Sequence, residues 1–337
     1  MSMTVTLTGS TGHVGTALAT RLCERGYSVR AIIHTRTTGL ESLPVQEVHA
    51  SLSDAESLRR AFAGSEIVFH AAARISITHR DAAEVTKTNV AGTRNVIDSC
   101  RAAGVRRLVH FSSIEAFSPR PLDSTLDEGR SLEDGRTGSP YALSKALAET
   151  EVRKAIAEGM DAVILNPTAV VGPLDNRPSL MGRAIIAFAT GAIPMLIDGG
   201  YDWVDVRDVA EAAVNAAEGA PRGSRYLLGG RWASMGEIAR MICDAAGRRA
   251  PRLTCPYVVA RISAPVSTLF SLLLSKEPLF TGYSLAALRG NRLISHQRAE
   301  RELGYRPRDL EETIRDTWRW FTEKGLVRLP AALPREA

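Results

Sequence analysis

Tyr141 and Lys145 lie four residues apart in the segment YALSK. If that segment is helical, their side chains lie on one face about one turn apart. A phenol titrates at about pH 10 and is a weak acid-base group at neutral pH, but a nearby ammonium or a cationic nicotinamide ring favours the phenolate. Such a tyrosine can exchange a proton with a carbonyl or alcohol oxygen. Because the chain holds seven tyrosines, one such pair could arise by chance, and other signals are needed.

A serine hydroxyl at the end of a predicted strand gives the second signal. Ser113 follows the apolar run 108–111, and a parallel α/β sheet places its site at the carboxyl ends of its strands. The stretch 119–139 is rich in Pro, Gly, Asp and Ser, which predicts a long surface loop. That loop would return the chain to the same edge at Tyr141, where Ser113 could hydrogen-bond a substrate oxygen.

A glycine-rich segment near the N-terminus predicts a dinucleotide site. Its glycines are spaced GxxGxxG between a strand pattern and a helix pattern. Such a loop lets the backbone approach a pyrophosphate, whose charge is stabilised by the exposed N–H groups at the helix N-terminus. The candidate contacts are Gly9, Thr11, Gly12, His13, Val14 and Gly15.

The residues after the second predicted strand bear on which dinucleotide is bound. An NAD enzyme usually carries an acid there for the ribose hydroxyls, whereas this chain has His34-Thr35-Arg36. His34 and Arg36 could meet a 2′-phosphate, so the sequence favours NADP over NAD. In the alternative interpretation Arg36 is a solvated loop cation.

The order of elements up to residue 172 is typical of βαβ units. Short β-branched runs alternate with longer helical patterns, which predicts an α/β fold with a doubly wound parallel sheet, a Rossmann domain over 1–172. The expected strands are 5–8, 29–33, 45–49, 67–70, 108–111 and 162–165, and the expected helices are 12–25, 54–63, 82–103 and 141–158.

Residues 173–330 are expected to form a smaller, mostly helical substrate-binding region. Helices are predicted at 234–246 and 310–324, and isolated strands at 203–206 and 226–228. The strand at 203–206 is expected to return to the main domain. The last ten residues are expected to form a loose tail.

Composition excludes several classes. The net charge of +5 is spread along the chain without a run of five like charges, which argues against nucleic-acid binding. The four cysteines have no CxxC spacing and the seven histidines no ligand-like spacing, so we expect reduced thiols and no metal. The first residues show a strand pattern and not that of a signal peptide, so we expect no such leader; the apolar run 262–274 is interrupted by Pro265 and too short for a membrane span. We expect a cytoplasmic protein.

Taken together, TGxxGxxG, a serine ending strand five and YxxxK resemble the extended short-chain dehydrogenase/reductase superfamily. The resemblance covers nearly the whole chain and extends to HAAA at 70–73, NVAGTRN at 89–95 and NPT at 166–168. SSIEAF, NPTAVVGP and YDWVDVRDVAEA are most similar to the branch of dihydroflavonol reductases and 3β-hydroxysteroid dehydrogenases.

The resemblance implies roles for individual residues. Ser113, Tyr141 and Lys145 would be the catalytic triad, with Asn89 at the fourth catalytic position. Lys145 would also bind the nicotinamide ribose. Two departures are His34, where the branch usually has Arg, and Ser51, where the third-strand motif usually has Asp. The further cofactor contacts would be Ser51, Leu52, Ala71, Ala72, Ala73, Ser112, Pro167 and Thr168.

The resemblance favours an enzyme that reduces a ketone or aldehyde with NADP(H), running reversibly as an alcohol dehydrogenase on a hydrophobic, aromatic or steroid-like small molecule. One alternative is a sugar-nucleotide epimerase or dehydratase with bound NAD. However, the dehydratases' Thr-Asp-Glu is Ser113-Ile114-Glu115 here, and Tyr201 stands where epimerases place a phosphate-binding Arg. A second alternative is a non-catalytic dinucleotide sensor, although such proteins typically lose the Tyr and Lys.

Helices 82–103 and 141–158 would suit a homodimer. The candidate substrate contacts are Ile75, Ile77, Glu115, Phe117, Tyr201 and parts of 257–280.

Overall fold

The computed structural model describes residues 2–34, 38–75, 81–136, 139–261 and 282–327. Arg36, Ile77, the apolar run 262–274 and the last ten residues, each the subject of a prediction above, lie outside these ranges. Within the described ranges, no helix is both long and apolar enough to cross a membrane.

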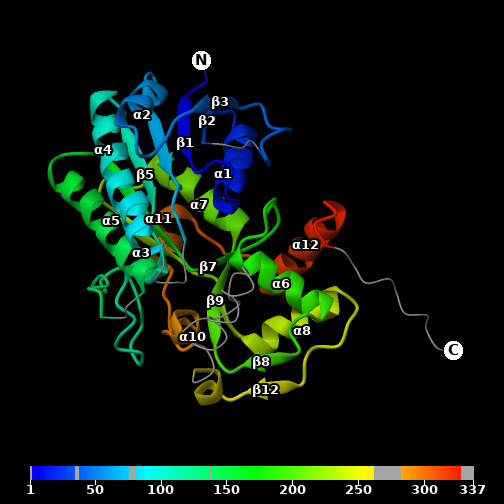
Figure 1. Ribbon diagram of the computed structural model, residues 1–337. Helices are drawn as coiled ribbons and strands as arrows, with labels where there is room; N and C mark the ends of the chain where they lie inside the picture. The colour runs from blue at the N-terminus through cyan, green and yellow to red at the C-terminus, as the bar shows by residue number, and fades with distance from the viewer. Residues whose placement is uncertain (1, 35–37, 76–80, 137–138, 262–281, 328–337) are drawn as a thin grey trace.

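A seven-stranded parallel sheet forms the centre of the molecule, in the order β10-β6-β5-β4-β1-β2-β3 (Figure 1). This confirms the predicted doubly wound α/β fold. The jump from β1 to β4 is the point where the strand order reverses, which is where such sheets bind ligands. The strands are β1 (Thr4–Thr8), β2 (Ser28–Ile33), β3 (Gln46–His49), β4 (Ile67–His70), β5 (Arg107–Phe111), β6 (Ala162–Pro167) and β10 (Arg225–Leu228).

Helices cover both faces of this sheet, so its strands are apolar on both sides. On one face, α1 (His13–Glu24) and α7 (Val206–Gly219) pack together and bury a cluster that includes Leu18 and Val209. On the other, α2 (Ala55–Phe62), α4 (Gly92–Ala102) and α5 (Pro140–Ala157) bury Leu58, Val96 and Val152. These two cores fix the position of the sheet edge where the predicted site residues lie.

The single helix predicted over 82–103 is divided in three. It consists of α3 (Ala82–Thr86), a π-helical turn (Lys87–Ala91) and α4. A π-helical turn inserts a residue and re-aims the side chains around it, and such turns are frequent at functional sites. The turn contains Asn89.

The strand near 203–206 does not join the main sheet, and its return to the main domain stays a prediction. β9 (Gly200–Asp205) pairs with β7 (Ala169–Val171) and β11 (Arg231–Ser234) in a separate sheet. β9 ends at Asp205, which is the N-cap of α7. The Asp205 carboxylate accepts a hydrogen bond from the Arg207 N–H (2.7 Å). The chain instead returns to the main sheet through α7 and β10.

The rest of the second part packs around β9. It contains α6 (Leu180–Thr190), α8 (Met235–Ala245) and α12 (Leu310–Glu323), whose apolar faces bury Phe188, Ile242 and Phe321. Figure 1 shows β8 and β12 at the end of the molecule farthest from the N-terminus. The remaining elements are β8 (Met195–Ile197), β12 (Leu253–Cys255), α10 (Gly282–Ala287), α11 (Gln297–Leu303) and the 3-10 turn Ile114–Ala116.

Candidate active site

The predicted cofactor residues within the described ranges follow the carboxyl ends of neighbouring strands. Six adjacent strands, from β3 to β6, carry them. With neighbouring strands about 4.8 Å apart, this edge spans roughly 24 Å, enough for an extended dinucleotide. From β3 to β6, the edge carries Ser51 and Leu52, His34, Gly9 to Gly15, Ala71 to Ala73, Ser112 and Ser113, and Pro167 and Thr168.

Close backbone approach explains the glycines of the loop after β1. Gly9 has φ +73°, and a Cβ on it would lie 2.6 Å from the backbone nitrogen of Ala72. A Cβ on Gly15 would collide with the carbonyl oxygen of Gly9. The loop after β1 is therefore packed directly on the loop after β4.

No side chain caps the N-terminus of α1 by a hydrogen bond. Its N-cap is Gly12, and its first turn carries no acidic residue. The N–H groups there can bind a pyrophosphate, which the positive end of the helix dipole favours. His13, the first helical residue, has Nε2 3.0 Å from the carbonyl oxygen of Pro173 and so links this helix to the loop after β7. These features fit a dinucleotide.

The adenine end of the edge is less defined. His34 is exposed after β2, and Ser51 Oγ lies 2.9 Å from Ser53 Oγ after β3. The amide of Asn95 donates to the carbonyl oxygen of Leu52 (2.7 Å) and fixes that loop on α4. The preference for NADP over NAD stays a prediction.

The structure brings Ser113, Tyr141 and Lys145 together. Helix α5 is N-capped by Ser139, whose hydroxyl accepts from the Ala142 N–H (3.2 Å), so Tyr141 and Lys145 lie in its first two turns. The Ser113 hydroxyl lies close enough to the Tyr141 hydroxyl to lower the pKa of that phenol. Lys145 is buried, and its ammonium donates to the carbonyl oxygen of Phe111 (2.8 Å), at the end of β5.

The protein shifts the two titrating groups of this cluster in opposite directions. Burial and the negative charge of Glu115 raise the pKa of Tyr141 above its ordinary value, and the nearby Ser113 hydroxyl opposes that shift. Burial lowers the pKa of Lys145 to about 8, although the Glu149 carboxylate partly offsets this. Lys145 thus loses its charge as the pH rises through about 8. The protein groups around Tyr141 therefore favour its protonated form, contrary to the simple expectation from the YxxxK pair.

Asn89 acts as a clamp between two segments. Its Oδ1 accepts from the Arg74 N–H (2.8 Å), and its Nδ2 lies 2.9 Å from both Arg74 O and Ser144 Oγ. These bonds join the loop after β4 to the residue next to Lys145. The geometry makes Asn89 a positioning residue, and its direct part in catalysis stays a prediction.

A buried ion pair under the site was missed from the sequence. The Glu149 carboxylate, with 0% of its side chain exposed, pairs with Arg225 of β10 (2.8 Å) and accepts from Asn166 Nδ2 (2.8 Å). The same Asn166 nitrogen donates to the backbone carbonyl of Ser113 (3.0 Å). The one available signal was spacing, since Glu149 follows Lys145 by four residues on the same face of the helix.

A second buried network extends from the end of β1. His70 Nδ1 lies 2.8 Å from Thr8 Oγ1 and its Nε2 lies 3.1 Å from Thr93 Oγ1, which donates to the carbonyl oxygen of Asn89 (2.6 Å). Burial lowers the pKa of His70 to about 3, so the ring is neutral at physiological pH. This chain of bonds secures the π-helical turn that carries Asn89.

The predicted substrate contacts lie in different surroundings. Tyr201 packs edge-on against Trp203 (5.6 Å between ring centroids), and its pKa is raised by burial and by the charge of Glu115. Part of Glu115 is exposed to solvent. The protein atoms packed around its carboxyl group nevertheless exclude water from it and raise its pKa to about 7. Ile75 is 59% exposed. Phe117, predicted as a pocket wall, instead packs with Leu126 and Leu227 beneath the guanidinium of Arg225, because an apolar ring after the 3-10 turn is more stable in the core.

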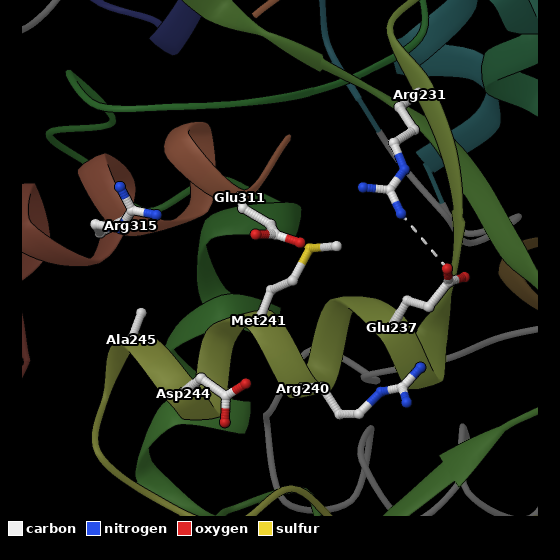
Figure 2. A pocket seen from close by; sticks show the side chains of 8 residues that line it. All are labelled: Arg231, Glu237, Arg240, Met241, Asp244, Ala245, Glu311 and Arg315. Carbon is white, nitrogen blue, oxygen red and sulfur yellow. Dashed lines mark ion pairs between the residues drawn. The ribbon is translucent and has the colours of Figure 1, made fainter. Parts of the chain in front are cut away.

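A large groove of about 660 Å³ lies on the surface formed by α8, α12 and β11, and none of its lining residues is a predicted site residue (Figure 2). Its charges are mixed, and Arg231 pairs there with Glu237 (3.6 Å). The positive and negative side chains of this groove offset one another, and none of them matches the Tyr141 and Lys145 pair at the sheet edge. We therefore favour the sheet edge as the active site. The lining residues are Arg231, Glu237, Arg240, Met241, Asp244, Ala245, Glu311 and Arg315.

The parallel sheet, the glycine loop and the clustered Ser113, Tyr141 and Lys145 define an extended short-chain dehydrogenase/reductase. Residues 5–229 match the NAD dependent epimerase/dehydratase family, and the chain belongs to it. It is therefore an NAD(P)-dependent enzyme of the extended type.

Named relatives are similar over most of the chain. Sterol demethylase protein B of Methylococcus capsulatus is 35% identical over 331 residues, which cover 96% of this chain and 100% of that protein. Dihydroflavonol 4-reductase of Hordeum vulgare is 30% identical over 303 residues, covering 83% and 84%. The crystal structure of gox2253 superposes with a TM-score of 0.85 at 32% identity and covers 97% of this chain and all of that one.

Gly15→Ala tests the cofactor loop. The added methyl group collides with the Gly9 carbonyl oxygen and must displace the loop, so we expect dinucleotide affinity to fall at least tenfold, about 1.4 kcal/mol, in a fluorescence titration. Gly219→Ala is the matched control, because a Cβ there meets nothing within 4 Å. Equal affinity of the two variants would contradict this site for the pyrophosphate.

Glu149→Gln tests the ion pair beneath the site. It leaves the Arg225 charge buried without its partner. The free energy of unfolding, measured by urea denaturation, should therefore fall by about 3 kcal/mol. It also removes the negative charge that raises the pKa of Lys145, so Lys145 should lose its proton at a lower pH. Cofactor affinity, which depends on the Lys145 ammonium, should then begin to fall below pH 8. Glu151→Gln, which breaks a more exposed pair on the same helix, should cost less than about 1 kcal/mol and leave the pH dependence unchanged.

Proposed function

We propose that this protein is an NADP(H)-dependent reductase of a ketone or aldehyde on a hydrophobic, steroid-like substrate, and that it runs reversibly as an alcohol dehydrogenase. The observation that carries the proposal is the gathering of Ser113, Tyr141 and the buried Lys145 ammonium at the carboxyl end of β5.

The chemistry follows from these three groups. The hydride for the carbonyl carbon would come from NADPH when it is bound at this edge. Tyr141 holds a proton on its hydroxyl and transfers it to the carbonyl oxygen, while Ser113 donates a hydrogen bond that orients that oxygen. Lys145 binds the nicotinamide ribose. The reverse reaction needs Tyr141 as the phenolate.

The proposed cofactor preference rests on charge after β2. His34, Thr35 and Arg36 supply no carboxylate that would repel a 2′-phosphate. His34 is exposed there and available to an anion. NAD remains the alternative cofactor, which the assay below compares directly.

The apolar surroundings of Tyr201 support a hydrophobic substrate. Tyr201 belongs to two apolar clusters, one of which joins it to Ile197, Tyr257, Leu285 and Leu288. A sugar nucleotide would need cationic groups for its pyrophosphate, and Tyr201 occupies the place where epimerases put an Arg. The similarity to sterol demethylase protein B supports a steroid-like ring system.

Tyr141→Phe tests the reaction. The variant keeps the ring and removes only the proton-carrying oxygen, so kcat should fall by about 10²- to 10⁴-fold while cofactor affinity stays within about twofold. The assay follows NADPH, then NADH, at the reduced-nicotinamide absorbance with steroid and aromatic ketones. Tyr27→Phe, whose hydroxyl bonds Glu218 on the surface, is the control. Near-normal turnover by Tyr141→Phe, or conversion of UDP-sugars without net cofactor change, would refute the reductase.

Glu115→Gln tests the electrostatics of Tyr141. Above about pH 7 Glu115 is ionised, and its charge raises the pKa of Tyr141, so the phenolate that alcohol oxidation needs forms only at higher pH. The variant should shift the rise of kcat/KM for oxidation to lower pH by roughly one unit. Below pH 7, where Glu115 is protonated, the pH dependence should match wild type. Glu66→Gln, at an exposed site, should leave the profile in place.

A further inference from the structure

Four large apolar side chains gather at the end of the molecule formed by β8 and β12. Met195, Leu253, Val258 and Val259, called here the β8–β12 lip, are 44%, 68%, 63% and 54% exposed. Exposed apolar residues are ordinary when they are single, whereas a group on adjoining segments indicates a surface that binds something.

Their arrangement follows from the local pairing. β8 and β12 are parallel, and Met195 and Leu253 are register partners, so their side chains project from the same face of this two-stranded sheet. Val258 and Val259 lie in the helical segment 257–261 that follows β12. The inner side of this segment is occupied, because Tyr257 and Ala260 pack into the cluster of Leu285 and Leu288.

The segment around the lip is strongly basic. Residues 245–261 include Arg248, Arg249, Arg252 and Arg261, all exposed, and no Asp or Glu. A fifth arginine, Arg289, stacks on the Tyr257 ring at 3.7 Å. Among the described residues, Asp244 directly precedes this segment, and Asp198 lies 3.9 Å from Arg289.

We propose that the β8–β12 lip docks on the surface of an anionic lipid bilayer. Apolar side chains of this kind insert below the headgroups, and arginines around them pair with lipid phosphates while their stems stay in the apolar layer. The complementary charge selects this occupant. A second copy of the chain, joined through a twofold axis, would bring like-charged arginines against each other. A nucleic acid would leave the apolar side chains exposed to its phosphates.

The docked orientation has a consequence that rests on the function proposed above. The cluster behind the lip, with Tyr257, Ile197 and Leu285, also contains Tyr201 of the candidate substrate site. The apolar cluster behind the lip therefore reaches a residue of the candidate substrate site. A hydrophobic ketone dissolved in the bilayer reaches the enzyme on the face that contacts the membrane.

Vesicle co-sedimentation of the full chain, without cofactor or substrate, tests the docking. Vesicles of phosphatidylcholine with phosphatidylglycerol should bind the protein, those of phosphatidylcholine alone at least tenfold less, and added salt should weaken binding. Leu253→Glu and Val258→Glu should each lower partitioning at least tenfold. Arg249→Ala and Arg252→Ala should each lower it about fivefold, equivalent to about 1 kcal/mol.

Matched controls lie elsewhere on the surface. Leu147→Glu on α5, where the leucine is 40% exposed, and Arg301→Ala on α11 should bind like wild type. Equal binding to both vesicle types, unchanged binding of the lip variants, or lip variants that change only the sedimentation coefficient of a self-associating protein would each overturn the proposal. Since no turnover is measured, failure here leaves the reductase assay untouched, and failure of that assay leaves the docking intact.

Discussion

The geometry of the site depends on one buried charge, the carboxylate of Glu149. It pairs with Arg225 on β10, the edge strand of the main sheet, and accepts from Asn166 at the end of β6. The same Asn166 amide holds the backbone of Ser113. Helix α5, which carries Tyr141 and Lys145, is thereby fastened to the strand end that carries Ser113. A buried charge is costly without its partners, so alternative positions of α5 that break these contacts are strongly disfavoured.

Polar groups on the other side of the site act in the same way. Thr8, His70 and Thr93 form a chain from β1 to the π-helical turn, and Asn89 on that turn clamps the loop after β4 to α5. The candidate catalytic residues therefore lie on packed elements whose positions are fixed before any ligand binds. Preorganisation of this kind removes the cost of ordering side chains during the reaction.

The electrostatic surroundings of Tyr141 favour its protonated form. Burial and the Glu115 charge raise its pKa, which keeps the phenol protonated and suits it to deliver a proton to a carbonyl. The buried Lys145 ammonium, with its pKa lowered to about 8, is retained at neutral pH with the support of Glu149. In the proposed reaction, these protein groups therefore suit reduction, and oxidation requires additional stabilisation of the phenolate.

The sequence by itself determined the doubly wound fold and indicated the candidate site residues, because both follow from local patterns. Strand and helix periods, the glycine loop before α1 and the YxxxK spacing are local properties of the chain. Only the tertiary structure decided what depends on distant residues: that β10 rather than β9 returns to the main sheet, that Phe117 packs beneath Arg225, and that Glu149 pairs across the sheet edge. It also decided the sign of the pKa shift at Tyr141, because desolvation and the charge of Glu115 arise from segments that meet only in the folded protein.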